Sequence, residues 1–271
     1  MSFFRPMRKK ETEFYFSMAL YTHFSIPCFA AEYTLDGYTL EHVFEEKDLG
    51  VVVDSELTFM EHIETKVQKA NSILGMIRRS FTFLDIVTMV TLFTAFVRPH
   101  LEYAHAVWSP SSLDLIKKIE KIQMRALDLV PELQSFDYPE QLRRAQLPTL
   151  SYRRLRGDMI DTFKHLPHVP KGYDTTFLSK SFTINQRCSR KHDYQLVRQH
   201  ENTSPLSRSF YFRIREIWNN LDESVVNSLT VNDFKNNHLD AHWENLDIKF
   251  NHKAPPPTRI SNMRRQLIDL V

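Results

Sequence analysis

Hydrophobic and polar positions recur at helical spacing in the first third of the chain. From Ile63 to Phe81 an apolar residue appears every three or four positions, so these side chains line one face of a helix. Lysine and arginine residues, among them Arg78 and Arg79, occupy positions off that face. The pattern predicts a basic amphipathic helix with one buried side.

The next predicted helix covers residues 86–97. Its residues are apolar nearly all round, and it follows Asp85, whose side chain can cap a helix N-terminus. We therefore expect this helix to be buried. Pro99 should end or kink it, because proline lacks the backbone N–H and disfavours helical geometry at the residue before it.

A third helix is predicted over residues 115–129. Ser111 and Asp114 have the spacing of a capping box before it. Its apolar residues share one face, and a basic stripe of Lys117, Lys121 and Arg125 runs along another. Together, the three helices predict a compact bundle.

Short strands are predicted before the bundle. Residues 32–53 alternate between apolar and polar types, and Asp36-Gly37 is a two-residue hairpin signal within them. Residues 49–53 read as a short β-branched strand. We expect a small antiparallel meander.

Helices and loops are predicted after the bundle. A short helix should begin at Asp137 and end near residue 145, and a longer one should begin at Thr149 or Ser151 and end before Pro167. Residues 168–207 lack a sustained period and predict loops, with short strands near 182–184 and 194–197. Two final helices, 210–220 and 231–243, precede a tail that begins at residue 248; Thr230 and Asp233 form a capping box for the second of them.

The predicted fold is mostly α, with a small N-terminal antiparallel β meander, a three-helix bundle and a second helical region. The boundaries expected from the sequence are an N-terminal segment 1–31, a meander 32–58, a bundle 59–134, a second helical region 135–245 that contains the loop-rich stretch 168–207, and a basic, proline-containing tail 246–271.

Composition excludes several classes of protein. With 271 residues, of which 42% are hydrophobic, the chain can bury a large core and is not disordered as a whole. Only 5 glycines occur, and none forms a Gly-rich phosphate loop, a dinucleotide fingerprint or a nucleophile elbow. The two cysteines, Cys28 and Cys188, are too far apart in sequence to indicate a disulfide framework or a Cys-based zinc module, so a reducing compartment is expected.

No metal or cofactor is expected. His238 and His242 are one helical turn apart, but the sequence between them lacks the glutamate that a zinc hydrolase places after its first histidine. Two-metal phosphoryl transfer depends on paired aspartates, and no Asp-Asp pair occurs in the sequence. The tryptophans Trp108, Trp218 and Trp243 could stack on bases, but each lies on or beside an apolar face, which favours core packing.

The formal net charge of +2 conceals an uneven distribution. Residues 31–64 contain ten acidic residues and one basic residue, whereas the chain after residue 64 has a surplus of basic residues. Two acid-free runs, 141–157 and 248–268, contain five basic residues each. Clustered arginines suit the phosphate backbone of nucleic acids because the guanidinium group donates a bidentate pair of hydrogen bonds.

Eight basic residues off the main apolar stripes are the candidate nucleic-acid-binding residues: Arg78, Arg79, Lys117, Lys121, Arg125, Arg153, Arg154 and Arg156. An alternative interpretation is a helical scaffold or protein-interaction module, in which the run 141–157 pairs internally with acids such as Asp158 and Asp161. A charge run is also commonly just a solvated face.

The first thirty residues loosely follow the pattern of a secretory signal. Basic residues precede an uncharged run from Phe14 to Ala31. Acidic Glu11 and Glu13 follow those bases, and polar residues and Pro27 interrupt the run. An intracellular location, nuclear or cytoplasmic, is therefore expected rather than secretion or a membrane anchor.

Five segments in order carry a family resemblance: KDLGVVVDSELTFMEHI (47–63), VRPHLEYAHAVWSP (97–110), IEKIQMRALDLVPEL (119–133), LPTLSYRRLRGDMIDTFK (147–164) and FRIREIWNNLDESVVNSLTVNDFK (212–235). Over residues 32–245 the chain resembles the C-terminal part of jockey-like reverse transcriptases of LINE-type, non-LTR retrotransposons. The resemblance implies the end of a palm, a helical thumb that holds template and primer, and a post-thumb helical region.

The same resemblance assigns no catalytic residue. In the family, the Tyr-x-Asp-Asp aspartates that hold Mg²⁺ precede the meander, and residues 1–31 do not align with that part. Asp222 stands where family members usually have proline, and no C-terminal Cys/His knuckle follows. The expected partner is therefore RNA, DNA or an RNA:DNA hybrid, bound without sequence preference; no small-molecule substrate, membrane contact or polymerase activity of the chain alone is expected.

Overall fold

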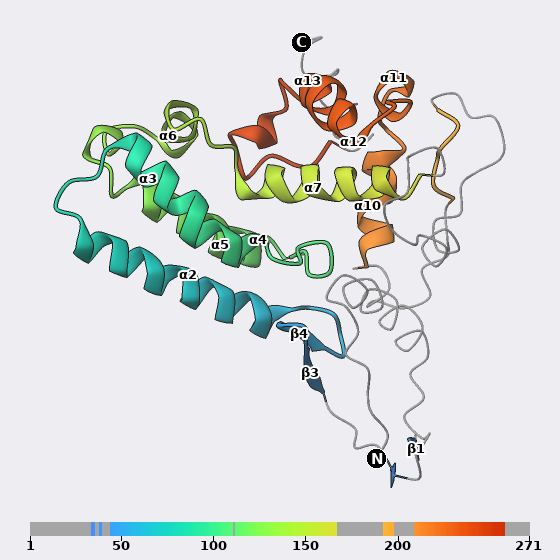
Figure 1. Ribbon diagram of the computed structural model, residues 1–271, viewed down its shortest axis with the longest axis horizontal. Coiled ribbons are helices and arrows are strands. Elements are labelled where there is room, and N and C mark those ends of the chain that lie inside the picture. Colours follow the sequence, from blue (N-terminus) through green and yellow to red (C-terminus); the bar gives the residue numbers. More distant parts are fainter. Residues whose placement is uncertain are drawn as a thin grey trace.

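The computed structural model describes residues 34–35, 38–39, 44–110, 112–166, 192–197 and 209–257. These residues are mostly helical, with short antiparallel strands near the N-terminal end (Figure 1). The predicted fold class is thereby confirmed. The expectations for residues 1–31 and for the strand at 182–184 lie outside the described residues, and the boundaries of the five predicted parts stay predictions.

The strands form two separate two-stranded ladders and not one meander. Strand β1 (Thr34–Leu35) pairs with β2 (Tyr38–Thr39), in the register that the Asp36-Gly37 signal predicts. Strand β3 (Glu45–Asp48) pairs with β4 (Val51–Asp54) through its own turn, in which Leu49 and Gly50 both have positive φ. That backbone matches the two-residue turns that favour hairpins, so each ladder closes on itself.

The predicted three-helix arrangement is formed. Helix α2 (Met60–Ser80) packs against α4 (Arg98–Glu102) and α5 (Leu113–Leu127). Asp54 fixes the start of α2, since its carboxylate accepts hydrogen bonds from the backbone N–H groups of Thr58 (3.0 Å) and Phe59 (2.6 Å). The N-cap of α5 is Ser112, one residue after the predicted Ser111.

Pro99 does not end the second helix. Helix α3 (Ile86–Leu92) continues through a π-helical segment, η1 (Phe93–Val97), directly into α4. In the π segment the backbone N–H of Arg98 reaches the carbonyl of Phe93, five residues back. This wider turn breaks the regular hydrogen-bond ladder just before Pro99, so a residue without an N–H is accommodated there.

The expectation that this helix is buried is wrong on one side. Met89, Phe93 and Val97 are fully buried, but Val87 and Phe96 are 75% and 58% exposed. In the described part of the chain, α2 and α5 cover one face of the helix and leave the other open. The lack of charged residues in 86–97 was therefore not a sign that every side of this helix is buried.

The remaining described helices follow α5 in the chain. They are η2 (Pro131–Leu133), α6 (Tyr138–Arg144), α7 (Leu150–Lys164), α10 (Phe210–Trp218), α11 (Glu223–Val226), α12 (Val231–Asp233), η3 (Phe234–Leu239), α13 (Asp240–His242) and η4 (Asp247–Lys249). The predicted caps Asp85, Asp137, Thr149 and Thr230 each accept a hydrogen bond from a backbone N–H in the first turn of their helix. In the 194–197 segment, Asn219 bonds both the N–H and the carbonyl of Leu196.

Two hydrophobic clusters hold the described residues together, and α7 takes part in both. The first cluster extends from Val51 to Leu150 and the second from Tyr152 to Ile248. Trp108 is buried in the first cluster, and Trp218 and Trp243 are buried in the second, as their apolar flanks predicted.

The chain beyond residue 247 does not begin as a tail. Ile248 is buried, and the carbonyl of Lys249 accepts a hydrogen bond from the backbone N–H of Thr149 at 2.9 Å. The hydroxyl of Thr149 donates to the carbonyl of Ile248 as well. The predicted tail is thus anchored at its start to the first residues of α7.

Candidate nucleic-acid interface

Helix α5 presents a row of exposed cations. Lys117, Lys121 and Arg125 are four residues apart and exposed, while Ile119 and Ile122 on the opposite side are buried in the core. At about 1.5 Å of rise per residue, successive cations in the row lie about 6 Å apart along the helix axis. The core fixes the helix from behind, so the row is held on a rigid element.

Helix α2 lies alongside this row. Lys118 pairs with Glu64, and Arg125 donates to the side-chain oxygen of Asn71 at 2.9 Å. In each pair the two residues are 54 positions apart in the sequence, so α2 and α5 run parallel in a constant register. Arg78 lies seven residues after Asn71, which carries the line of basic residues past the end of α5 to the C-terminal end of α2.

Two groups on elements that pack near α5 have lowered pKa values. Partial burial, and secondly the charge of Lys47, lower the pKa of Lys66 on α2. On the other side of α5, burial lowers the pKa of His252, and the charges of Lys253 and Lys117 lower it further. Burial is the larger cause of both shifts, and the neighbouring cations add to it.

We refer to six exposed residues as the basic surface: Arg78, Arg79, Lys117, Lys118, Lys121 and Arg125. Its ion pairs are weak ones. Lys117 lies 3.7 Å from Asp114, and both side chains are more than half exposed, so solvent screens the interaction. Exposed lysine and arginine side chains are the groups that most often contact phosphate oxygens in nucleic-acid complexes.

The remaining three candidates occupy a different environment on α7. Arg153 forms a bidentate pair with Glu102 of α4, with one contact at 3.0 Å. Arg156 forms a bidentate pair with Asp240 of α13, at 2.6 and 2.8 Å. Arg153 and Arg156, which the sequence places among the candidate phosphate-binding residues, are therefore not free to reach phosphate in this structure, because each already holds a carboxylate.

Arg154 is the most enclosed of the three, at 5% exposure, and it lies near Glu120 of α5. Glu120 is itself fully buried and accepts hydrogen bonds from the hydroxyl of Tyr138 (2.7 Å) and the backbone N–H of Leu150 (3.1 Å). Burial raises the pKa of Glu120, and the charge of Arg154 acts in the opposite direction. We call Arg153, Arg154 and Arg156, with Glu102, Glu120 and Asp240, the α7 arginine cluster.

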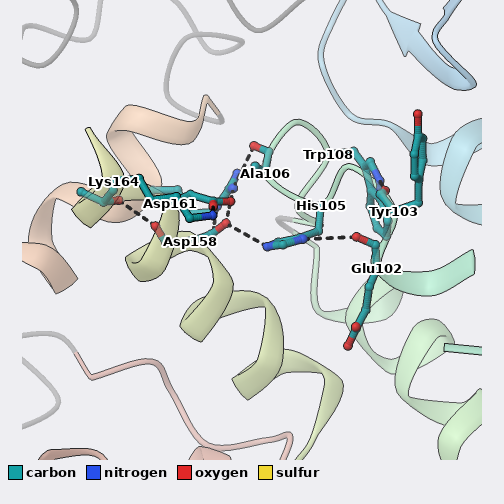
Figure 2. Close-up of polar contacts among 10 residues, drawn as sticks. Glu102, Tyr103, His105, Ala106, Trp108, Asp158, Asp161 and Lys164 are labelled. Atoms are coloured by element: carbon teal, nitrogen blue, oxygen red, sulfur yellow. Dashed lines mark hydrogen bonds and ion pairs between the residues drawn. The ribbon is translucent and has the colours of Figure 1, made fainter. Parts of the chain in front are cut away.

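Asp158 and Asp161 have other partners than the α7 arginines. Asp158 holds Arg213 of α10 at 3.0 and 3.2 Å, and Asp161 holds Lys164. Figure 2 shows the imidazole of His105 between the backbone of Glu102 and the carboxylate of Asp158. Helix α7 bears Gly157 at this point, and a Cβ there would overlap the His105 ring.

The sequence-based list also missed part of the surface. Lys118 was not among the candidates, although it follows Lys117 and lies on the side of α5 that contacts α2. Its helical position, three residues before Lys121, could have indicated this. Within the described residues, no group of three or more His, Cys, Asp or Glu side chains could hold a metal ion, and no helix is long and apolar enough to cross a bilayer.

Comparison with known proteins gives two relatives. An uncharacterized protein of Caenorhabditis elegans is 26% identical over 190 residues, which cover 67% of this chain and 91% of that protein. The RNA-directed DNA polymerase from the mobile element jockey of Drosophila funebris is 31% identical over 101 residues, which cover 35% of this chain and 11% of that protein. No family model and no solved structure matches the chain. About a third of the chain is thus similar to a small part of a retrotransposon RNA-directed DNA polymerase.

Proposed function

We propose that this chain binds RNA, DNA or an RNA:DNA hybrid without sequence preference, as the thumb-like part of a jockey-type reverse transcriptase. The exposed row on α5 is the observation that carries the proposal. Its cations are backed by a rigid core and are left to solvent apart from weak surface pairs. The similarity to the jockey polymerase supports the same partner class.

The binding mechanism is electrostatic. Each phosphate that a lysine or arginine neutralises releases condensed counterions, which favours binding at low salt. The row from Lys117 to Arg125 extends about 12 Å along α5, enough to follow several phosphates of one strand. Contacts of this kind position a nucleic acid and carry no sequence information.

Removal of two cations from the centre of the row tests the proposal. Lys121→Gln with Arg125→Gln should make the dependence of log affinity on log salt less steep by about two units, since each lost phosphate contact removes about 0.9. The measurement is a fluorescence-anisotropy titration of a labelled RNA:DNA hybrid at several salt concentrations.

Lys164→Gln with Lys235→Gln is the matched control, because it removes the same charge from α7 and η3 in the second region. This control should leave the salt slope within about half a unit of the unsubstituted chain. Equal flattening by both variants would mean that overall charge, and not the basic surface, governs binding. No salt-dependent binding by the unsubstituted chain at micromolar concentration would refute the proposal.

A lack of polymerase activity in this chain alone stays a prediction. It rests on the sequence, which contains no Asp-Asp pair. Primer extension with Mg²⁺ or Mn²⁺ tests it, and nucleotide incorporation above a heat-inactivated control would contradict it.

A helical scaffold remains the second candidate function. The ion pairs of Arg153 and Arg156 favour it, as does the exposed apolar side of the α3–α4 helix at Val87 and Phe96. On this account Lys121→Gln with Arg125→Gln changes neither stability nor nucleic-acid binding. The titration above therefore separates the two candidates.

A further inference from the structure

The C-terminal end of α2 combines two exposed aromatic rings with two exposed cations. Phe81 and Phe83 are 40% and 63% exposed, and Arg78 and Arg79 directly precede them. The connection from α2 to α3 forms one end of the described fold, on the side away from strands β3 and β4 (Figure 1). The packing of the described residues does not explain why two large aromatic side chains are exposed at this position.

The loop that carries the rings is fixed at both ends. The backbone N–H of Phe81 still donates to the carbonyl of Ile77, and Leu84 is buried in the first cluster. Asp85 then caps α3, where both its carboxylate oxygens bond Thr88 at 2.8 and 2.9 Å. The rings are therefore displayed by an anchored segment and not by a free end.

The charge around the rings is positive. Residues 65–84 contain four basic residues and no acidic one. Among the described residues, neither Arg78 nor Arg79 belongs to an ion pair. An apolar surface that binds another protein needs no such positive charge. A polyanion with flat aromatic groups matches both the cations and the exposed rings.

We infer that the end of α2 binds single-stranded nucleic acid, with the bases on Phe81 and Phe83 and the phosphates on Arg78 and Arg79. This inference rests on the proposed function, because it continues the line of cations from Lys118 and Arg125 by one further heptad of α2. Bases in a duplex are stacked on one another, so only an unpaired strand can offer its base faces to the rings.

Two substitutions separate base stacking from apolar contact. Phe81→Leu with Phe83→Leu keeps large apolar side chains but removes the aromatic faces. We expect this variant to bind a labelled oligodeoxyadenylate of about 12 nucleotides about 10-fold more weakly than the unsubstituted chain. Its affinity for a blunt duplex and for an abasic strand of equal length should change less than about 2-fold, because both probes lack accessible base faces. The same thermal melting as the unsubstituted chain would show that the fold is retained.

Arg78→Gln with Arg79→Gln provides the complementary change. It should make the salt dependence of single-strand binding less steep by about one to one and a half units, and it should weaken binding of the abasic strand as well. Met76→Leu is a control for the exposed apolar residue one turn earlier on α2, and it should change neither affinity.

Three results would overturn the inference. If the leucine variant binds the single strand as tightly as the unsubstituted chain, the rings do not stack on bases, although the proposed duplex-binding function stands. Equal weakening for the abasic and the normal strand would likewise exclude stacking. If no probe shows salt-dependent binding to the unsubstituted chain, the proposed function fails, and the inference fails with it.

Discussion

The two sides of helix α5 place charged side chains in opposite environments. On its outer side, Lys121 and Arg125 point to solvent, with no carboxylate closer than a weak surface pair along the row. On its inner side, Glu120 is fully buried and faces Arg154 of α7. The three arginines of α7 are thus engaged within the protein, while the row on α5 remains exposed.

The difference follows from where the carboxylates lie. Three other elements bring carboxylates to α7: Glu102 comes from α4, Glu120 from α5 and Asp240 from α13. Glu102 and Asp240 each hold a guanidinium fork in the bidentate geometry that suits it. The row on α5 meets only exposed acids, whose pairing with lysine is worth little in water. The density of basic residues along a sequence is therefore a weaker guide to a binding surface than helical spacing combined with the absence of facing acids.

The largest expected effect comes from the inner side of α5. Glu120→Ala should lower the free energy of unfolding by about 3–5 kcal/mol, because it leaves the buried Tyr138 hydroxyl and the N–H of Leu150 without their acceptor and takes a negative charge away from the neighbourhood of buried Arg154. Urea unfolding measures it. Glu140→Ala, which removes an exposed partner of Arg143 and Arg144, should cost about 1 kcal/mol or less. A similar loss in both variants would mean that the buried carboxylate of Glu120 stabilises the fold no more than the half-exposed carboxylate of Glu140.

The packing behind the basic surface should matter almost as much. Ile119→Ala and Leu74→Ala should each lower the free energy of unfolding by about 2–5 kcal/mol, since both side chains are buried between α2 and α5. Neither change removes a charge. Circular-dichroism melts check the loss, and an unchanged melting temperature in both variants would place these faces on the wrong side of the bundle.

A smaller effect should depend on pH and report on the first cluster alone. Burial, and secondly the charge of Lys66, lower the pKa of His62 to about 4, and the ring accepts the N–H of Val52 through Nδ1 at 3.2 Å. Since the unfolded pKa is higher, the stability that the neutral ring contributes is present above about pH 6.5 and is lost as the pH falls toward 4.

His62→Asn isolates this contribution. Between pH 7 and pH 5 the unsubstituted chain should lose about 2 kcal/mol more than the variant, because asparagine can accept the same hydrogen bond without titrating. Urea unfolding at the two pH values measures the difference. Parallel losses in both proteins would contradict the assignment to His62.

The local features of the fold followed from the sequence, whereas the partners of the arginines did not. The caps at Asp85, Asp137, Thr149 and Thr230 and the helices that they begin depend on residues a few positions apart, so spacing was sufficient. The π segment before Pro99 and the ion pair of Arg156 with Asp240, 84 residues away, depend on tertiary packing. For the candidate site, the row on α5 was predictable from its four-residue spacing. The enclosure of Arg154 was not predictable, because Glu120 becomes its neighbour only when α5 and α7 pack together.

We propose that the basic surface, and not the α7 arginine cluster, holds nucleic acid. The most direct test compares Lys121→Gln with Arg125→Gln and Arg153→Gln with Arg156→Gln, each losing two charges, in salt titrations on one RNA:DNA hybrid. The α5 variant should flatten the salt slope by about two units, and the α7 variant should leave it unchanged while lowering the melting temperature. A flattened slope in the α7 variant, with the α5 variant unaffected, would contradict the account.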